Sequence, residues 1–149
     1  MTGLLVACIG SETDSDSTDS KSLGSDSLKE ARVVRVIDGD TLDVLINGTK
    51  HRVRLFGIDT PERGEKCYRE ATSRMRELSG DVVNIESGPR TEDRYGRLLF
   101  YLYTQDGESI DARLIQEGLA TAWTRDGQHR NLLVAEEHKA KETGTGCLW

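Results

Sequence analysis

Two short segments of this sequence, residues 37–41 and 54–62, together hold four carboxylates and one arginine. Asp38 and Asp40 flank a glycine, and Arg54 precedes Asp59 and Glu62. Carboxylates accept protons and hydrogen bonds, and a guanidinium forms bidentate bonds to phosphate or carboxylate groups. All five residues fall at the ends of predicted strands. Packing alone does not explain such a group, so this stretch is a candidate chemical site.

Each of these residues also has a purely structural explanation. Asp-Gly pairs are ordinary turn formers, so Asp38 and Asp40 on their own favour a turn. Asp59 could form an Asx turn, and Glu62 could be a solvated charge at the start of a helix. Arg54 could be an exposed sheet residue. The joint occurrence of the five residues is what favours the chemical interpretation.

Further along, the sequence supplies a second arginine, Arg97, and three histidines. After residue 30, arginines far outnumber lysines. This composition suits bidentate contact with phosphate or carboxylate, although high genomic GC content would produce it too. His51, His129 and His138 lack the spacing of a zinc site, and we expect all three at the surface.

Strands are the elements that must position the candidate site. Apolar alternation predicts five of them, at residues 31–37, 41–46, 50–58, 82–86 and 98–103. Asn47-Gly48 predicts a tight hairpin, because both residues tolerate positive φ. Residues 88–97 are polar and are expected to form a loop.

Helical spacing of apolar residues predicts three helices, at residues 65–78, 110–117 and 129–141. Ser109 is the expected N-cap of the second helix. This order of elements favours an α+β, mainly β fold: a five-stranded OB-fold Greek-key barrel with three helices, a fold that commonly binds oligonucleotides. The alternative is another α+β sheet with helices on one face. We expect one domain over residues 31–149.

The first thirty residues differ from this domain. Leu5-Val6-Ala7-Cys8 resembles the lipobox of prokaryotic lipoproteins, in which the cysteine is lipidated. Residues 11–27 are rich in Ser, Asp and Thr and are expected to be a disordered acidic tether. No stretch approaches the roughly 18 apolar residues of a membrane span. The alternatives are a tail without a function and a mis-assigned start codon.

Taken in order, several motifs resemble the staphylococcal nuclease (thermonuclease) family. They are Ile37-Asp38-Gly39-Asp40-Thr41, Arg54, Asp59-Thr60-Pro61-Glu62, Tyr95-Gly96-Arg97 and Glu117-Gly118-Leu119-Ala120. The resemblance covers residues 33–149. It implies an OB barrel with three helices, in agreement with the fold expected from periodicity. It also implies a Ca²⁺-dependent monomeric nuclease that hydrolyses phosphodiester bonds of DNA and RNA, with single strands preferred.

The resemblance assigns a metal site to one half of the motif stretch. Asp40 and Asp59 would give carboxylate oxygens to Ca²⁺, and Thr60 would give its backbone carbonyl. Asp38 would lie near the metal without binding it. Ca²⁺ takes oxygen ligands in a flexible shell, so waters and a phosphate oxygen can complete this set.

The resemblance assigns the remaining roles to four residues. Glu62 would orient or deprotonate the attacking water, as a general base does. Arg54 and Arg97 would clamp the scissile phosphate, where lysine would be a poor substitute. Tyr95 would lie along the nucleotide. The alternative function is a non-catalytic OB-fold module that only binds nucleic acid.

The sequence departs from the family pattern in three places. One is the loop before Tyr95, where Thr91-Glu92-Asp93-Arg94 is one residue longer than in the prototype. Thr124 and Asp126 stand where the prototype has aromatic residues, so base preference is open; Trp123 is nearby. The segment between Glu62 and Tyr68 is shorter than the mobile loop of the prototype, which affects substrate access.

Cys67 opens the first predicted helix and Cys147 is the third residue from the end of the sequence. We expect these two cysteines to form a disulfide, in keeping with an exported protein. The expected location is extracellular or at the cell surface, with a lipid anchor at Cys8. The alternative is a pair of free thiols in a cytosolic chain.

Overall fold

The computed structural model describes residues 28–149. Cys8 and the expected acidic tether therefore lie outside the described residues. Seven strands and three helices make up the described part. They are β1 (Lys29–Val36), β2 (Thr41–Ile46), β3 (Thr49–Leu55), β4 (Ile58–Asp59), α1 (Tyr68–Ser79), β5 (Val82–Glu92), β6 (Leu98–Tyr103), α2 (Ile110–Gln116), β7 (Thr121–Ala122) and α3 (Arg130–Glu142).

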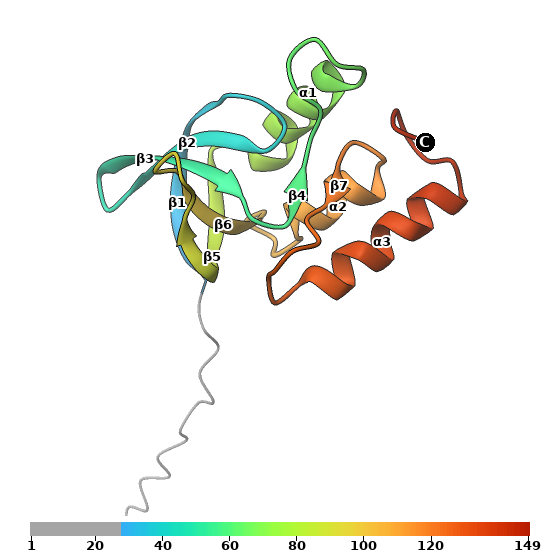
Figure 1. Cartoon of the computed structure of the whole chain (residues 1–149). Coiled ribbons are helices and arrows are strands. Elements are labelled where there is room, and N and C mark those ends of the chain that lie inside the picture. Colours follow the sequence, from blue (N-terminus) through green and yellow to red (C-terminus); the bar gives the residue numbers. More distant parts are fainter. Residues whose placement is uncertain (1–27) are drawn as a thin grey trace, which may run out of the picture.

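Five strands close into a barrel in the order β1-β2-β3-β6-β5 (Figure 1). All neighbours are antiparallel except β3 and β6, which are parallel. The β2–β3 hairpin turns at Asn47 and Gly48, with φ values of 50° and 79°, as their tolerance of positive φ predicts. The expected mainly β, α+β class with a five-stranded barrel and three helices is confirmed.

Two features of the sheet differ from the expectation. The prediction of a loop over residues 88–97 is wrong for its first half, because β5 continues to Glu92. Glu92 pairs with Leu98, and the pairing of β5 with β6 is irregular between Ser87 and Glu92. A tight turn follows, closed by the Gly96 N–H, which donates to the Asp93 carbonyl (3.1 Å). A second, two-stranded sheet of β4 and β7 was also not anticipated.

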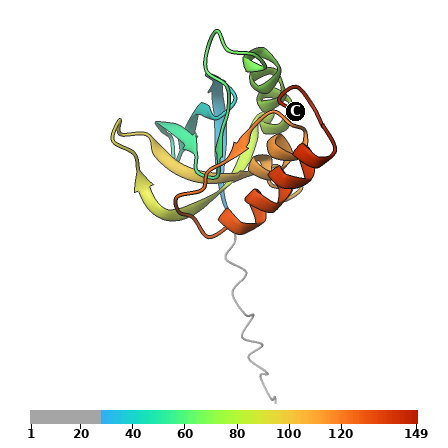
Figure 2. The same cartoon turned by 45° about the vertical axis from the view of Figure 1, so that its right-hand side comes forward.

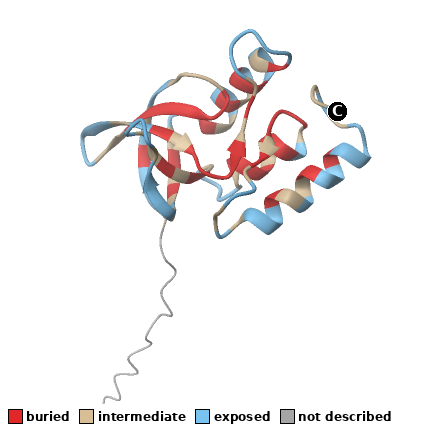
Figure 3. Cartoon of the chain, in the orientation of Figure 1, coloured by how far each residue is buried: buried red, intermediate tan, exposed pale blue. Residues whose placement is uncertain are grey.

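The helices cover one side of the barrel (Figure 2). α1 begins at Tyr68 instead of residue 65, because Cys67 takes a left-handed conformation (φ 72°). Ser109 caps α2 as expected, accepting from the Ala112 N–H (3.1 Å). α3 packs against α2 and β7 through a buried stripe that includes Leu133 (Figure 3). No helix among the described residues is long and apolar enough to cross a membrane.

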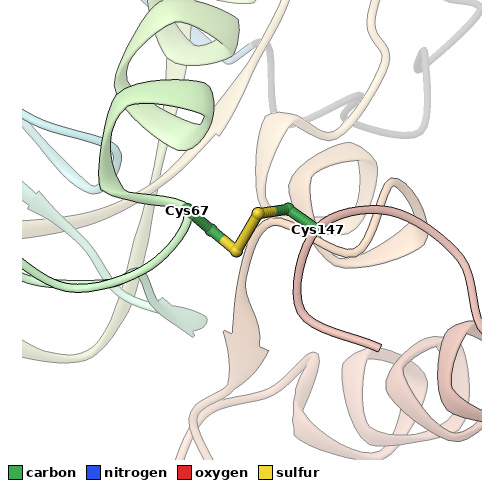
Figure 4. Close-up of a disulfide and its surroundings, with 2 residues drawn as sticks. All are labelled: Cys67 and Cys147. Carbon is green, nitrogen blue, oxygen red and sulfur yellow. A yellow bond between two sulfur atoms is a disulfide. The ribbon is translucent and has the colours of Figure 1, made fainter.

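A disulfide joins the start of α1 to the C-terminal tail, between Cys67 and Cys147 (Figure 4). The tail is held against the end of α2, where the Leu148 N–H donates to the Gly118 carbonyl (3.0 Å). A Cβ atom on Gly118 would lie 1.9 Å from the Thr145 carbonyl oxygen, so only glycine allows this approach. The disulfide therefore links α1 to a tail that is itself anchored.

His129 is wrongly expected to be a simple surface residue. Its ring lies edge-on to the buried Tyr101, with 4.6 Å between centroids, and its Nε2 is 2.9 Å from Glu86 Oε2. It thereby connects the start of α3 to β5. His138 is exposed and His51 half-buried.

A fully buried carboxylate joins α2 to the barrel. The Gly57 and Leu102 N–H groups each donate to Asp111, both at 3.0 Å. Burial raises the pKa of Asp111 from 3.8 to about 6, against the opposing effect of these two hydrogen bonds. Asp111 thus satisfies two buried donors that no strand partner reaches.

We expect Asp111→Ala to lower the free energy of unfolding by about 2–4 kcal/mol, because two buried N–H groups lose their acceptor. The unfolded chain releases the Asp111 proton near pH 3.8 and the native state near pH 6. The stability advantage of the wild type over the variant should therefore narrow as pH rises through this window. Urea unfolding at several pH values measures both effects. Asp106→Ala, at an exposed turn position, is the control.

Candidate active site

A cavity of about 880 Å³ opens where the ends of several elements meet. Most of the candidate residues from the sequence line it: Asp38, Asp40, Arg54, Asp59, Glu62, Tyr95 and Arg97. The barrel therefore brings residues from the β1–β2 turn, the end of β3 and the β5–β6 turn to one place. Thr60 does not line the cavity, but its backbone is bonded to Asp40.

Asp40 is the most buried carboxylate of the cavity, with 6% of the residue exposed. Its Oδ2 accepts from the Thr60 N–H (2.9 Å), and its Oδ1 accepts from the Thr41 hydroxyl (3.0 Å). The Asp40 N–H in turn donates to Asp38 Oδ1 (3.1 Å). The β1–β2 turn and the chain after β4 are therefore fastened together at this residue.

The Arg54 guanidinium lies between two candidate metal ligands. Its Nη2 is 3.3 Å from Asp40 Oδ2 and forms a close ion pair with Asp59. Its Nη1 donates to the Ile58 carbonyl (2.6 Å) and to the Leu55 carbonyl. One cation thus balances two carboxylates and fixes the bend between β3 and β4.

The donor set suits a hard cation. Within residues 28–149 no three Asp, Glu, His or Cys side chains form a metal-binding group. An ion held by Asp40 and Asp59 would therefore complete its shell with carbonyl and water oxygens, which Ca²⁺ accepts. Burial and the charge of Asp40 raise the pKa of Asp38. A cation beside this pair would relieve their repulsion, so the residues fit the expected metal.

Arg97 is held by Asp93, a residue that the sequence interpretation missed. Asp93 accepts from Arg97 Nε (2.7 Å) and from the Arg97 and Tyr95 N–H groups (3.0 and 2.9 Å). Burial opposes ionisation of Asp93, but the hydrogen bonds from Arg97 and Tyr95 outweigh it and lower its pKa. The aspartate two residues before Tyr95 was the available signal, since aspartates often bond to the backbone two residues on.

Glu62 and Tyr95 are the exposed members of the site. The Glu62 N–H donates to Glu65 Oε2 (2.7 Å), whereas the Glu62 carboxylate has no hydrogen-bond partner within residues 28–149. The Tyr95 ring is covered by two guanidiniums, those of Arg94 (4.8 Å from its centroid) and Arg97 (5.5 Å). Glu62 is thus free to meet a ligand, while Tyr95 is already paired with cations.

The chain after β7 forms another part of the cavity wall. The Trp123 indole N–H donates to Asp126 (2.7 Å), which also accepts from Arg90 Nε (2.5 Å). The Arg125 guanidinium lies over the Trp123 ring, 5.1 Å from its centroid. Asp126 therefore anchors this wall instead of stacking, and Thr124 is exposed outside it. Arg90 and Arg125 were not anticipated as cavity residues.

An OB-type barrel with carboxylates and guanidiniums around one open cavity defines a protein with a site for phosphate esters. The family described as Staphylococcal nuclease homologue matches residues 52–149. A micrococcal nuclease from Shigella flexneri is 34% identical over 125 residues, covering 78% of this chain and 71% of the relative. A thermonuclease from Staphylococcus intermedius is 34% identical over 119 residues, covering 74% and 70%.

A third relative, the endonuclease YncB from Bacillus subtilis, is 43% identical over 95 residues, which cover 58% of this chain and 44% of the relative. The family match takes in more than half of the chain. The chain therefore belongs to the staphylococcal nuclease family, as its motifs predicted.

Because Asp93 orients Arg97, we expect Asp93→Ala to lower nuclease kcat, by up to ~10²-fold, through misplacement of the guanidinium. The barrel should stay folded, which circular dichroism would check. Asp81→Ala, an exposed carboxylate at the start of β5, is the matched control. Unchanged turnover in Asp93→Ala would show that Arg97 needs no such support.

Proposed function

We propose that the cavity is the active centre of a Ca²⁺-dependent nuclease that hydrolyses phosphodiester bonds of DNA and RNA, with single strands preferred. The observation that carries this proposal is the convergence of Asp40, Arg54, Asp59, Glu62 and Arg97 on one open cavity. Membership of the family, with relatives named as nucleases, makes the chain a phosphodiester hydrolase. The free carboxylate of Glu62 favours catalysis over the alternative of a non-catalytic binding module.

In this proposal Asp40, Asp59 and the Thr60 carbonyl hold Ca²⁺, which would act as a Lewis acid and template for the phosphate. Asp38 stays beside Asp40 through the Asp40 N–H and adds negative charge to the site. Arg54 keeps Asp40 and Asp59 at a fixed spacing through its two ion pairs. Arg54 is therefore a positioning group for the metal ligands as well as a candidate hydrogen-bond donor to the phosphate.

Glu62 is the proposed water-activating residue. Its carboxylate is unpaired within the described residues, so it can accept a proton from water or hold that water in line. Arg97 donates hydrogen bonds to the phosphate oxygens, whose negative charge grows in the transition state. Donors that are already held in position before the reaction are the most effective in this role. Asp93 holds the Arg97 guanidinium in position by accepting from its Nε. Tyr95, beside Arg97, is placed to contact the nucleotide.

The decisive experiment digests single-stranded DNA with Ca²⁺ or with a chelator. We expect cleavage only with Ca²⁺, and a loss of about 10²–10⁴-fold in kcat for Glu62→Gln, because a general base contributes about that much. Glu70→Gln, at an exposed glutamate in the first turn of α1, is the control. DNA binding without cleavage in either condition would instead support the binding module.

We also propose that the protein is exported and held at the cell surface by a lipid on Cys8, and that it acts as a monomer. A short lipobox-like segment, an acidic spacer and a disulfide in the folded domain support this placement.

In a bacterial host, the wild type should incorporate labelled fatty acid and sediment with membranes, whereas Cys8→Ser should do neither. Cys8→Ser should keep its nuclease activity, because Cys8 lies outside the domain. Equal membrane association of both proteins would rule out the lipid anchor.

A further inference from the structure

A row of charged side chains crosses the outer face of the barrel beside the cavity. Arg35 of β1 pairs in register with Asp43 of β2, and Asp43 pairs with Arg52 of β3. The parallel pair Val53↔Leu98 places Arg97, the residue just before β6, next to Arg52 of β3. The row therefore begins at an arginine of the proposed active centre and runs away from it across three more strands.

Asp43 is the buried carboxylate to which the cations of this row are paired. Only 1% of its side chain is exposed, and three cations reach it: Arg52 (2.8 Å), Arg35 (3.4 Å) and Lys50 (3.6 Å). The hydrogen bond from Arg52 is the main cause of the lowered pKa of Asp43, so the carboxylate is ionised. One buried negative charge meets three positive charges whose side chains are 46–63% exposed.

Stability alone does not account for this surplus. One arginine with two hydrogen bonds already satisfies a carboxylate, as Arg52 does here. Exposed ion pairs contribute little, and the extra cations repel each other. The surplus positive charge is also unusual for a chain whose net charge is −6. A polyanion at this face would make the arrangement favourable.

We propose that Arg35, Lys50 and Arg52, here called the basic row, bind the sugar-phosphate backbone of the nucleic-acid strand that extends beyond the scissile phosphate. The inference rests on the proposed function, because the strand is expected to enter the row from Arg97. Adjacent strands are about 4.8 Å apart, so Arg97 and Arg35 are separated by roughly 14 Å. This span exceeds one nucleotide, so the row binds long substrates and not the shortest ones.

The test compares a short and a long substrate. The variant Arg35→Gln/Lys50→Gln removes two charges and keeps the Arg52–Asp43 pair, so no buried charge is left alone. For a single-stranded 20-mer we expect KM to rise about tenfold with kcat unchanged, because two phosphate contacts are lost. The slope of log KM against log salt concentration should fall by about 1.4. For a dinucleotide, both constants should stay at wild-type values.

Lys139→Gln/Lys141→Gln, with the same change of charge on α3 and away from the cavity, is the matched control and should behave as wild type. Equal losses on both substrates, or no loss on the 20-mer, would overturn the proposal. A third result would also overturn it: the wild type binds vesicles of anionic lipid, Arg35→Gln/Lys50→Gln does not, and the two proteins have the same kinetics on the 20-mer.

Failure of the proposed function gives a different result. The wild type would then cleave neither substrate, and fluorescence anisotropy of a labelled 20-mer would still report on the basic row. Weaker binding by Arg35→Gln/Lys50→Gln than by the lysine control would support the row without catalysis. Equal binding would reject it.

Discussion

The site depends on one cation, Arg54, placed between two carboxylates. Its guanidinium contacts Asp40 and Asp59 and two backbone carbonyls of the bend between β3 and β4. Without that charge, Asp40 would lie largely buried beside Asp38 with no counter-charge, which is costly. The same contacts bring β4 back against the barrel. The same Arg54 contacts therefore balance the charges of the cavity and hold the bend between β3 and β4.

A second cation–carboxylate pair repeats this principle at the β5–β6 turn. The Asp93 carboxylate accepts from the Arg97 side chain and from the Arg97 and Tyr95 N–H groups, so the β5–β6 turn and the guanidinium take one conformation together. Asp126 does the same for Arg90 and Trp123. Each candidate phosphate-binding cation is thus oriented by a carboxylate, which limits the conformational entropy that a bound phosphate would have to restrict.

Local pattern was enough to predict much of this fold, whereas the site residues were predicted from their joint occurrence and from the family resemblance. The bounds of β2 and β6 agree with the sequence, because their alternating or apolar residues face one core. The end of β5 could not be predicted, since Glu92 stays in the strand through pairing with Leu98 and not through its own preference. The motif residues line one cavity, as their joint occurrence predicts. Arg90 and Arg125 were missed because their roles depend on contacts that only the folded chain makes, whereas Asp93 had a local signal in its bond to the backbone two residues on.

The elements that carry the site differ in how they are held. Arg54 stands on a strand whose backbone is paired on both sides, so its position is fixed by the barrel. Glu62 stands on a short exposed segment that bonds only within itself and to Tyr68 among the described residues. The two ends of that segment are nevertheless fixed, by the Thr60–Asp40 bond on one side and by the Cys67–Cys147 disulfide on the other. Because few residues lie between these two anchors, Glu62 has little freedom to leave the cavity.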